Sequence, residues 1–229
     1  KILENEKYQK DLFLKNISFK NISFSYEQKK IFENFNFEIK KNKLLLIYGE
    51  SGSGKSTLLN LLMGLIEPTS GDILLDDQDS IFNNKTNWRN IVSYVPQQIY
   101  LLDDTVEKNI AFGEKTKNID HERLKQAIKL SKLDNFLREN DLNKYNLGEK
   151  GMKISGGQIQ RIGVARALYR NPKVLLLDES TNGLDYETEK NFLNDLKELK
   201  KEITIIFVSH REHIKNHADE FIEIKKLNS

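Results

Sequence analysis

The sequence predicts an α/β fold built around a mostly parallel sheet. Three short runs, residues 44–47, 174–177 and 203–208, are almost entirely apolar, as expected of parallel strands covered on both faces. Segments with helical spacing lie between these runs, which is typical of parallel strands joined by helices. Two further runs, residues 17–26 and 35–39, alternate apolar and polar residues, so each is expected to bury one face in an antiparallel edge layer.

A helical insertion is expected in the middle of the chain. Between residues 101 and 153 apolar positions follow helical spacing with charges between them, and Asp120 is a candidate helix cap. A later helix is expected over residues 186–201, before the last apolar strands. Residues 221–224 are expected to close the sheet.

Composition restricts the class of protein. The 229 residues are 38% hydrophobic and 31% charged, which is typical of a soluble globular domain. With 36 Lys and Arg against 34 Asp and Glu, the chain lacks the positive excess that favours nucleic acid, so no nucleic-acid partner is expected. The absence of cysteine excludes disulfides and thiolate metal sites. No apolar run approaches the ~20 residues that a membrane-spanning helix needs.

The beginning of the chain indicates a domain of a longer protein. The first residue is Lys1 and no signal-peptide pattern follows, so a missing upstream part is expected. We expect a linker over residues 1–12, one domain over residues 13–229, and a helical subdomain at about 99–153 within it.

A glycine-rich stretch directly after the first apolar run predicts a phosphate-binding loop. Residues 49–56 read GESGSGKS, which fits GxxxxGK[ST] between a strand and the helix start LLNLLMGL. In such a loop backbone amides point at phosphate oxygens, the lysine reaches the β- and γ-phosphates, and the last hydroxyl ligates Mg²⁺. The alternative is a flexible turn that matches by chance. The candidate binding residues are Gly49, Ser51, Gly52, Ser53, Gly54, Lys55, Ser56 and Thr57.

An acidic pair at the end of a second apolar run predicts hydrolysis. In VLLLDES, residues 174–180, Asp178 is placed to hold Mg²⁺ through its water shell, and Glu179 is placed to orient or deprotonate an attacking water. By itself such a pair would as readily begin an ordinary loop. Together with the glycine-rich stretch it favours a nucleotide hydrolase.

Six motifs then occur in a fixed order: GESGSGKS, YVPQ, ISGGQ, VLLLDE, NGLD and VSH. This ordered set resembles the ATP-binding cassette (ABC) ATPases, a group of P-loop NTPases, over about residues 13–225. The resemblance implies ATP and Mg²⁺ as ligands, with no other metal. It also implies a head-to-tail dimer, in which each ATP lies between the phosphate loop of one copy and the ISGGQ segment of the other.

The ISGGQ segment supports that dimer on physical grounds. Ser155, Gly156 and Gly157 are expected to open a helix over residues 158–169, so that their amides and the helix dipole form a second phosphate site, with Gln158 beside it. One chain cannot fold both phosphate sites onto one nucleotide. A second copy of the chain is therefore the expected partner.

The resemblance also implies roles for four further residues. Tyr26 matches an aromatic residue that stacks on adenine, although an ordinary strand tyrosine is the alternative. Gln97 matches a glutamine that touches Mg²⁺ and the attacking water, and Gln98 lies one place beyond the pattern. His210 matches a histidine that contacts the γ-phosphate, and Asp185 matches a segment that crosses the dimer interface.

Four other residues are expected to have no role in ligand binding. Trp88 is expected in the core, and His121, His213 and His217 lie outside the motifs and are expected to be solvated. The departures from the family pattern are small. Ile154 replaces a leucine of similar volume, and NGLD stands where many exporters have SALD, so neither change removes a chemical group.

A short segment favours an exporter. NLGEKG, residues 146–151, resembles a loop of exporter-type cassettes that lies against the membrane domain, with Glu149 at the contact, although a solvated turn glutamate is the alternative. The chain as a whole resembles the cassettes of bacterial flippases for lipid-linked oligosaccharides. This likeness implies a transmembrane domain as partner and a place on the cytoplasmic face of the inner membrane.

Two rival functions remain open. A DNA-repair or chromosome ATPase of the same superfamily would carry a long heptad insertion before ISGGQ, and no sustained heptad run occurs there. A switch that binds ATP without hydrolysing it is opposed by Glu179 and His210, which are both present.

Overall fold

The computed structural model describes residues 13, 15–138, 147 and 154–227 of the chain. The expected linker over residues 1–12 and the expected membrane-domain contact at Glu149 lie outside these residues. No helix of the described part is long and apolar enough to cross a membrane.

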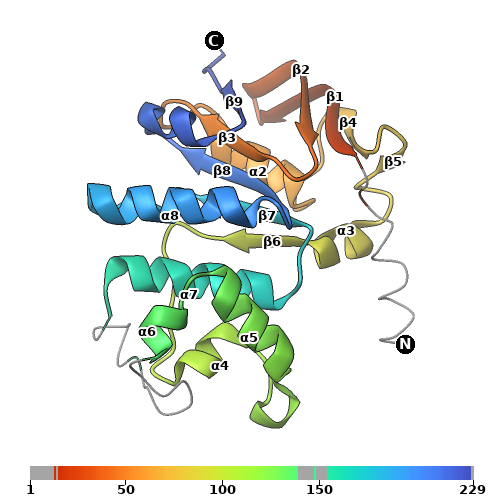
Figure 1. Ribbon diagram of the computed structural model, residues 1–229. Coiled ribbons are helices and arrows are strands. Elements are labelled where there is room, and N and C mark those ends of the chain that lie inside the picture. The colour runs from red at the N-terminus through yellow and green to blue at the C-terminus, as the bar shows by residue number, and fades with distance from the viewer. Residues whose placement is uncertain (1–12, 14, 139–146, 148–153, 228–229) are drawn as a thin grey trace.

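The α/β prediction is confirmed, with two sheets and a group of helices (Figure 1). The parallel sheet has the strand order β6-β7-β8-β3-β9, and the antiparallel sheet has the order β2-β1-β4-β5. The parallel strands are β3 (Leu44–Tyr48), β6 (Val92–Val95), β7 (Val174–Asp178), β8 (Thr204–Ser209) and β9 (Glu220–Glu223). The antiparallel strands are β1 (Asn16–Tyr26), β2 (Lys29–Lys40), β4 (Ser70–Leu75) and β5 (Asp79–Ser80).

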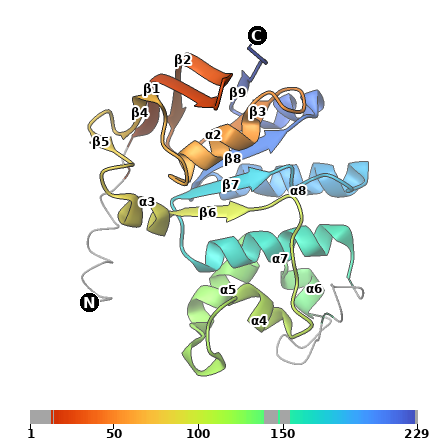
Figure 2. The same cartoon turned by 180° about the vertical axis from the view of Figure 1, so that it is seen from behind.

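The helices connect the strands of the two sheets. The described α-helices are α2 (Lys55–Leu62), α3 (Lys85–Ile91), α4 (Val106–Ile110), α5 (His121–Leu130), α6 (Asp134–Arg138), α7 (Gly156–Tyr169) and α8 (Tyr186–Leu199), with 3₁₀ turns η1 (Thr116–Asn118) and η3 (Glu212–His217). Figures 1 and 2 show α4, α5 and α6 gathered on the far side of α7 from the parallel sheet. This group is the described part of the expected helical insertion.

Three of the parallel strands, β3, β7 and β8, bury both faces, as their apolar runs predict. Successive side chains of a strand point to opposite faces, so the strand residues divide between two cores. Leu44 and Leu46 face the core shared with α7 and α8, whereas Leu45 and Ile47 face the core shared with α2 and the antiparallel sheet. The central strands are therefore held from both sides and provide a rigid base for the loops that follow them.

The antiparallel layer and the helix caps also follow the sequence. β1 pairs with β2 and β4 in antiparallel register, and Ile17 lies opposite Ile39 and Leu75. The Asp120 side chain accepts hydrogen bonds from the amides of Glu122 and Arg123, as its predicted cap requires. The helix after ISGGQ begins at Gly156, two residues before the predicted start, because Ser155 supplies its N-cap.

Candidate functional site

Four of the predicted site segments meet at one edge of the parallel sheet. The glycine-rich loop follows β3, Gln97 follows β6, Asp178 ends β7 and His210 follows β8. The carboxyl ends of parallel strands lie at the same edge of a sheet, which is where α/β proteins bind ligands. Sequence segments that are far apart are brought together here by the strand order alone.

The loop after β3 leaves no space for side chains at its two ends. A Cβ atom on Gly49 would lie 2.3 Å from the carbonyl oxygen of Ile224. Gly54 has a φ of 109°, and a Cβ there would lie 2.7 Å from Cγ2 of Ile31. Glycine is therefore required at both positions. Between them the hydroxyl of Ser53 is buried without a hydrogen-bond partner, a polar group that a phosphate oxygen would satisfy.

Lys55 lies folded over this loop. Its Nζ donates hydrogen bonds to the carbonyl oxygens of Gly49 at 2.8 Å and Glu50 at 2.7 Å, and the residue is 6% exposed. Burial lowers the pKa of Lys55, and the nearby carboxylates of Glu179 and Asp178 act in the opposite direction. The ammonium group is thus desolvated and hydrogen-bonded to the loop, with the carboxylates of Asp178 and Glu179 favouring its charged form.

Asp178 is paired with a tyrosine of the neighbouring strand. The Tyr94 hydroxyl, on β6, donates a 2.9 Å hydrogen bond to Oδ2 of Asp178. Burial raises the pKa of Asp178, the Tyr94 hydrogen bond partly offsets this, and the negative charge of Glu179 adds to the rise. Burial followed by that hydrogen bond also raises the pKa of Tyr94, so its hydroxyl stays protonated and remains a donor.

Glu179 is held by amide groups from two directions. Its Oε2 accepts hydrogen bonds from Gln97 Nε2 at 3.0 Å and from Asn182 Nδ2 at 2.6 Å. Its Oε1 lies 3.5 Å from Nδ1 of His210. The backbone of Glu179 has a φ of 45°, in the left-handed region that non-glycine residues seldom adopt. Such local strain is often found at functional sites.

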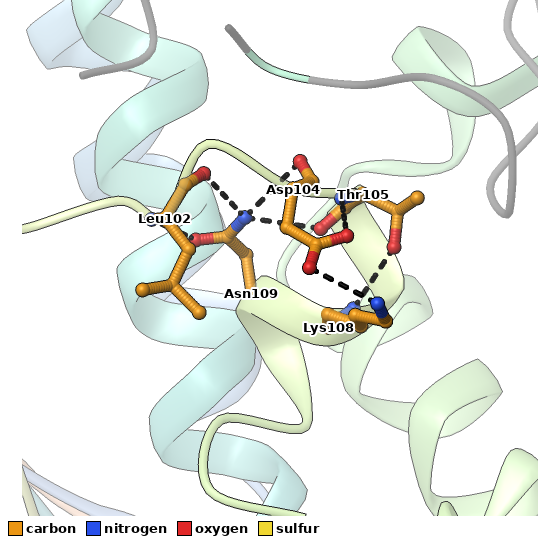
Figure 3. A network of polar contacts seen from close by, with 5 residues as sticks. All are labelled: Leu102, Asp104, Thr105, Lys108 and Asn109. Carbon is orange, nitrogen blue, oxygen red and sulfur yellow. Dashed lines mark hydrogen bonds and ion pairs between the residues drawn. The ribbon is translucent and has the colours of Figure 1, made fainter. Parts of the chain in front are cut away.

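The segment after Gln97 is fastened to the helix that ISGGQ opens. Asn109 is fully buried, and its amide nitrogen donates to the carbonyl oxygens of Leu102, Asp104 and Thr105, as Figure 3 shows. On α7, the Arg166 guanidinium donates to the carbonyl oxygens of Asn109 at 2.8 Å and Tyr100 at 2.9 Å. Gln97 is therefore followed by a loop that is tied to α7.

α7 begins with a capping box, and the amides of two of its first residues have no described acceptor. The Ser155 hydroxyl accepts from the amide of Gln158, and the Gln158 side chain accepts from the amide of Ser155. No described residue accepts a hydrogen bond from the amides of Gly156 or Gly157. The start of a 14-residue helix with two free amides is a suitable place for an anion.

The ISGGQ and NGLD segments lie against each other. A Cβ on Gly157 would come within 2.7 Å of Cγ2 of Thr188, and one on Gly156 would lie 3.5 Å from Cδ2 of Leu184. Asp185 caps α8 through the amide and hydroxyl of Thr188, and these hydrogen bonds lower its pKa. In the described residues neither segment has a hydrogen bond to the loop after β3.

Tyr26 lies apart from the sheet edge, at the end of β1. Its ring is 47% exposed and meets Phe24 edge-on, with ring centroids 4.9 Å apart. Nearby, a cleft of about 630 Å³ separates the β1–β2 turn from the glycine-rich loop, and Lys30, Ser53 and Lys226 are among its lining residues. This cleft has the size of a small-molecule site.

The oxygen groups at the sheet edge suit Mg²⁺. Ser56 presents a hydroxyl, Gln97 an amide and Asp178 a carboxylate, which are the oxygen ligands that this ion prefers. The described residues include no group of three or more His, Cys, Asp or Glu that would hold a metal. Mg²⁺ commonly binds through one or two carboxylates, water and substrate phosphates, so this donor set fits it.

One histidine prediction needs correction, that for His217. The side chain of His213 is 51% exposed, in keeping with its prediction, and its Nε2 also lies 2.8 Å from Oε2 of the buried Glu189. His217 has a buried Nδ1 without a hydrogen-bond partner, and burial lowers its pKa. His121 is exposed as expected, with Glu107 3.4 Å away. Trp88 is 1% exposed and donates to the carbonyl oxygen of Leu62, which confirms its place in the core.

Two residues at this edge make contacts that the sequence did not predict. Tyr94 lies in the YVPQ motif and Asn182 in NGLD, yet neither was assigned a role. Spacing within the motifs carries no sign that Tyr94 would reach Asp178. The relevant signal was that Asn182 stands where many related cassettes have serine, since this change adds an amide donor beside Glu179.

Comparison with known proteins identifies the family. The family model of the ABC transporters matches residues 32–182. An export ATP-binding/permease protein of Rickettsia prowazekii is 40% identical over 214 residues, which cover 92% of this chain and 37% of the relative. An ATP-dependent lipid A-core flippase of Mannheimia succiniciproducens is 37% identical over 222 residues, covering 95% of this chain and 38% of the relative.

A solved structure agrees with this family. A bacterial Atm1-family ABC exporter with ATP bound superposes with a TM-score of 0.78 at 32% identity, covering 92% of this chain and 37% of the other. The chain thus spans between a third and two fifths of the length of these relatives. On these matches and the P-loop fold, the chain belongs to the ABC transporter family and is an ATP-binding ATPase domain of it.

Proposed function

We propose that this chain hydrolyses MgATP as the motor of a bacterial ABC exporter, and that the exported molecule is a lipid-linked oligosaccharide or another lipid-like substrate. The observation that carries the ATPase part is the meeting of Lys55, Asp178 and Glu179 with Gln97 and His210 at one sheet edge. That arrangement supplies a phosphate-binding cation, a carboxylate base and polar groups that orient them.

The residues of the sheet edge, together with Tyr26 at the end of β1, have separate roles in ATP binding and hydrolysis. The amides of the glycine-rich loop and Lys55 bind the β- and γ-phosphates, and Tyr26 stacks on the adenine. Glu179 accepts a proton from the water that attacks the γ-phosphorus, while Gln97 and Asn182 hold its carboxylate in place. As the water oxygen bonds to the γ-phosphorus, the bond from that phosphorus to the β–γ bridging oxygen breaks, and ADP and phosphate are released. His210 donates a hydrogen bond to the γ-phosphate from beside Glu179. Mg²⁺, held by Ser56, Gln97 and Asp178, would neutralise phosphate charge.

A second copy of the chain completes each site. The free amides at the start of α7 offer a phosphate site, and among the described residues they make no hydrogen bond to the glycine-rich loop of the same chain. Ser155, Gly156, Gly157 and Gln158 of one copy would therefore close over the ATP of the other, with Asp185 at the interface. The expected dimer is head-to-tail, with two equivalent ATP sites.

The membrane partner is proposed from the length of the relatives. This chain corresponds to 37% of an export ATP-binding/permease protein, which leaves room for a permease part. We place the chain at the cytoplasmic face of the inner membrane, as the domain from residue 13 onward with residues 1–12 as its linker. The loop after Gln97 and the helical subdomain at about 99–153 would face the transmembrane domain.

The substrate is supported by likeness alone. The chain resembles cassettes of lipid-linked oligosaccharide flippases, and one relative is named as a lipid A-core flippase. Both molecules have an acyl or polyprenyl anchor and a sugar headgroup. An amphipathic lipid of that class is therefore the proposed cargo.

Two experiments test these steps separately. Phosphate release by the purified chain, with Glu179→Gln as the matched variant, distinguishes an ATPase from a switch that only binds ATP. ATP-dependent translocation by the full-length transporter in proteoliposomes, offered either a fluorescent lipid-linked oligosaccharide or a fluorescent lipid A-core, tests the cargo. Phosphate release without translocation of either lipid would overturn the substrate proposal and leave the ATPase proposal standing.

A further inference from the structure

Glu189 is a buried carboxylate that the hydrolytic roles above do not use. It lies in the first turn of α8, and its side chain is 4% exposed. Its Oε1 accepts a 2.8 Å hydrogen bond from NH1 of Arg211, and its Oε2 lies 2.8 Å from Nε2 of His213. Burial by itself would raise the pKa of Glu189, but its donors, His213 and Arg211 among them, outweigh burial and hold that pKa below its ordinary value.

The pair is attached to the segment that carries His210. Arg211 is the next residue along the chain, and its amide donates to the hydroxyl of Ser209, which is the last residue of β8 and is 1% exposed. The side chain of His210 is 51% exposed, and its Nδ1 is 3.5 Å from Oε1 of Glu179. With so little contact of its own, the imidazole depends on the backbone between Ser209 and Arg211 for its position.

Glu189, at the α8 end of the pair, is connected to the ISGGQ and NGLD segments, which are proposed to face the second copy. Glu189 follows Thr188, whose amide and hydroxyl bind the capping Asp185, and whose methyl group limits the space beside Gly157. A continuous series of contacts therefore runs from the start of α7, through the first turn of α8 and the Glu189–Arg211 pair, to His210 and Glu179.

We propose that Glu189 and Arg211 are positioning residues that fix the His210 imidazole relative to Glu179 and make its place depend on the first turn of α8. This inference rests on the proposed role of His210 in hydrolysis. The simpler alternative is an ion pair that only stabilises the fold, since breaking a buried pair is destabilising wherever it lies. The two readings differ in whether the effect on turnover passes through His210.

A double-mutant cycle distinguishes the two readings in the 229-residue chain. Glu189→Gln and Arg211→Ala are expected to lower kcat for ATP about tenfold with KM nearly unchanged, within the ~10²-fold that a small misplacement of a reacting group costs. Arg211→Lys, which keeps the charge, is expected to recover part of that loss. In a His210→Ala background the same substitutions should cause less than about a twofold further loss, because the group they position is gone.

A spectroscopic measurement supplies a readout besides activity. The chain has four histidines, so ring Cε1–H resonances in NMR spectra are assignable by single substitutions. Glu189→Gln and Arg211→Ala should shift the His210 resonance and leave that of the distant His121 unchanged. Glu198→Gln is the matched control, because it removes an exposed carboxylate at the end of the same helix, where it pairs with Lys201 just beyond α8.

Each outcome decides the proposal. Equal losses in the wild-type and His210→Ala backgrounds, or an unmoved His210 resonance, would show an ion pair that acts on the fold alone. Full turnover in His210→Ala by itself would refute the role of His210 in hydrolysis, and the positioning proposal with it. Melting temperatures of all variants, with turnover read well below the lowest of them, keep loss of folding apart from loss of positioning.

Discussion

The two halves of the proposed ATP site are built in contrasting ways. At the sheet edge, Lys55, Glu179 and Asp178 are already engaged with neighbours from four different strand ends. At the start of α7, Ser155 is engaged only with its own turn, and the amides of Gly156 and Gly157 point to no described acceptor. Under the proposed function, the sheet-edge half would bind ATP in a single copy, whereas the half at the start of α7 would contribute only when a second copy approaches.

This contrast predicts that ATP binding and association of two copies depend on different residues. Changes at the sheet edge should affect ATP binding or hydrolysis by each copy. Changes at the start of α7 should leave binding to a single copy intact and affect association. The following variants test this division.

The largest effect is expected for Lys55→Ala. This change removes a desolvated ammonium that faces the carboxylates of Glu179 and Asp178 and is proposed to bind phosphate. ATP binding measured by calorimetry should become undetectable, at least about 10²-fold weaker, since hydrogen bonds to charged groups contribute about 1.5–3 kcal/mol each. Lys85→Ala, on the distant α3, is the control. Retained micromolar affinity would refute the role of Lys55.

The second largest effect is expected for Glu179→Gln. The amide keeps the size of the side chain but cannot accept a proton, so turnover should fall by about 10²-fold or more while ATP affinity is retained. Phosphate release and calorimetry measure the two quantities, with the exposed Glu202→Gln as control. Near-normal phosphate release would exclude Glu179 as the base.

Gly156→Asp tests the half of the proposed ATP site that lies at the start of α7. The residue is exposed, and an added Cβ lies at an ordinary 3.5 Å from Leu184, so the fold should be kept. Its carboxylate would meet a phosphate, and like charges ~4 Å apart repel by about 4 kcal/mol at an effective dielectric constant of 20.

The expected result is a loss of ATP-driven association in a Glu179→Gln background, measured by sedimentation, with unchanged ATP affinity of the single copy. Gly156→Ala is the matched control and should associate normally. Weaker ATP binding by single copies of Gly156→Asp would contradict the division into two halves.

Asn182→Ala should have a moderate effect. It removes one of the two amide donors to Oε2 of Glu179, leaving that of Gln97. A hydrogen bond to a charged group contributes about 1.5–3 kcal/mol, so kcat should fall by about tenfold if Asn182 orients the base. Asn182→Ser restores the residue common in related cassettes and should recover part of the rate. Equal KM values in all three proteins would place the effect on the hydrolytic step.

The smallest effect on function is expected for Trp88→Phe. The substitution leaves the carbonyl oxygen of Leu62, at the end of α2, without its indole donor. Stability should fall by about 1–3 kcal/mol, and each kcal/mol lowers Tm by about 2–4 °C in a domain of this size. ATP affinity should be unchanged, with the exposed Tyr100→Phe as control. A changed ATP affinity would mean that the packing of α2 on Trp88 contributes to ATP binding as well as to stability.

Much of the fold and the order of the site segments could be predicted because their signals are local. Continuous apolar runs mark strands buried on both faces, and alternating runs mark the antiparallel layer, since side-chain direction has a fixed period along a strand. The glycine-rich loop was recognisable because its residue types and its place between strand and helix belong to one short stretch. These features need no information about distant residues.

The contacts that complete the site were decided by the tertiary structure. Tyr94 and Asp178 are 84 positions apart, and Gln97 and Glu179 are 82 apart, so only the pairing of β6 with β7 brings them within hydrogen-bond distance. The same holds for the contact of Glu189 with Arg211 and for the packing of Gly157 on Thr188. Residue types along the chain determine which groups are present. Which of them meet depends on strand order and packing, because hydrogen bonds require contact in space.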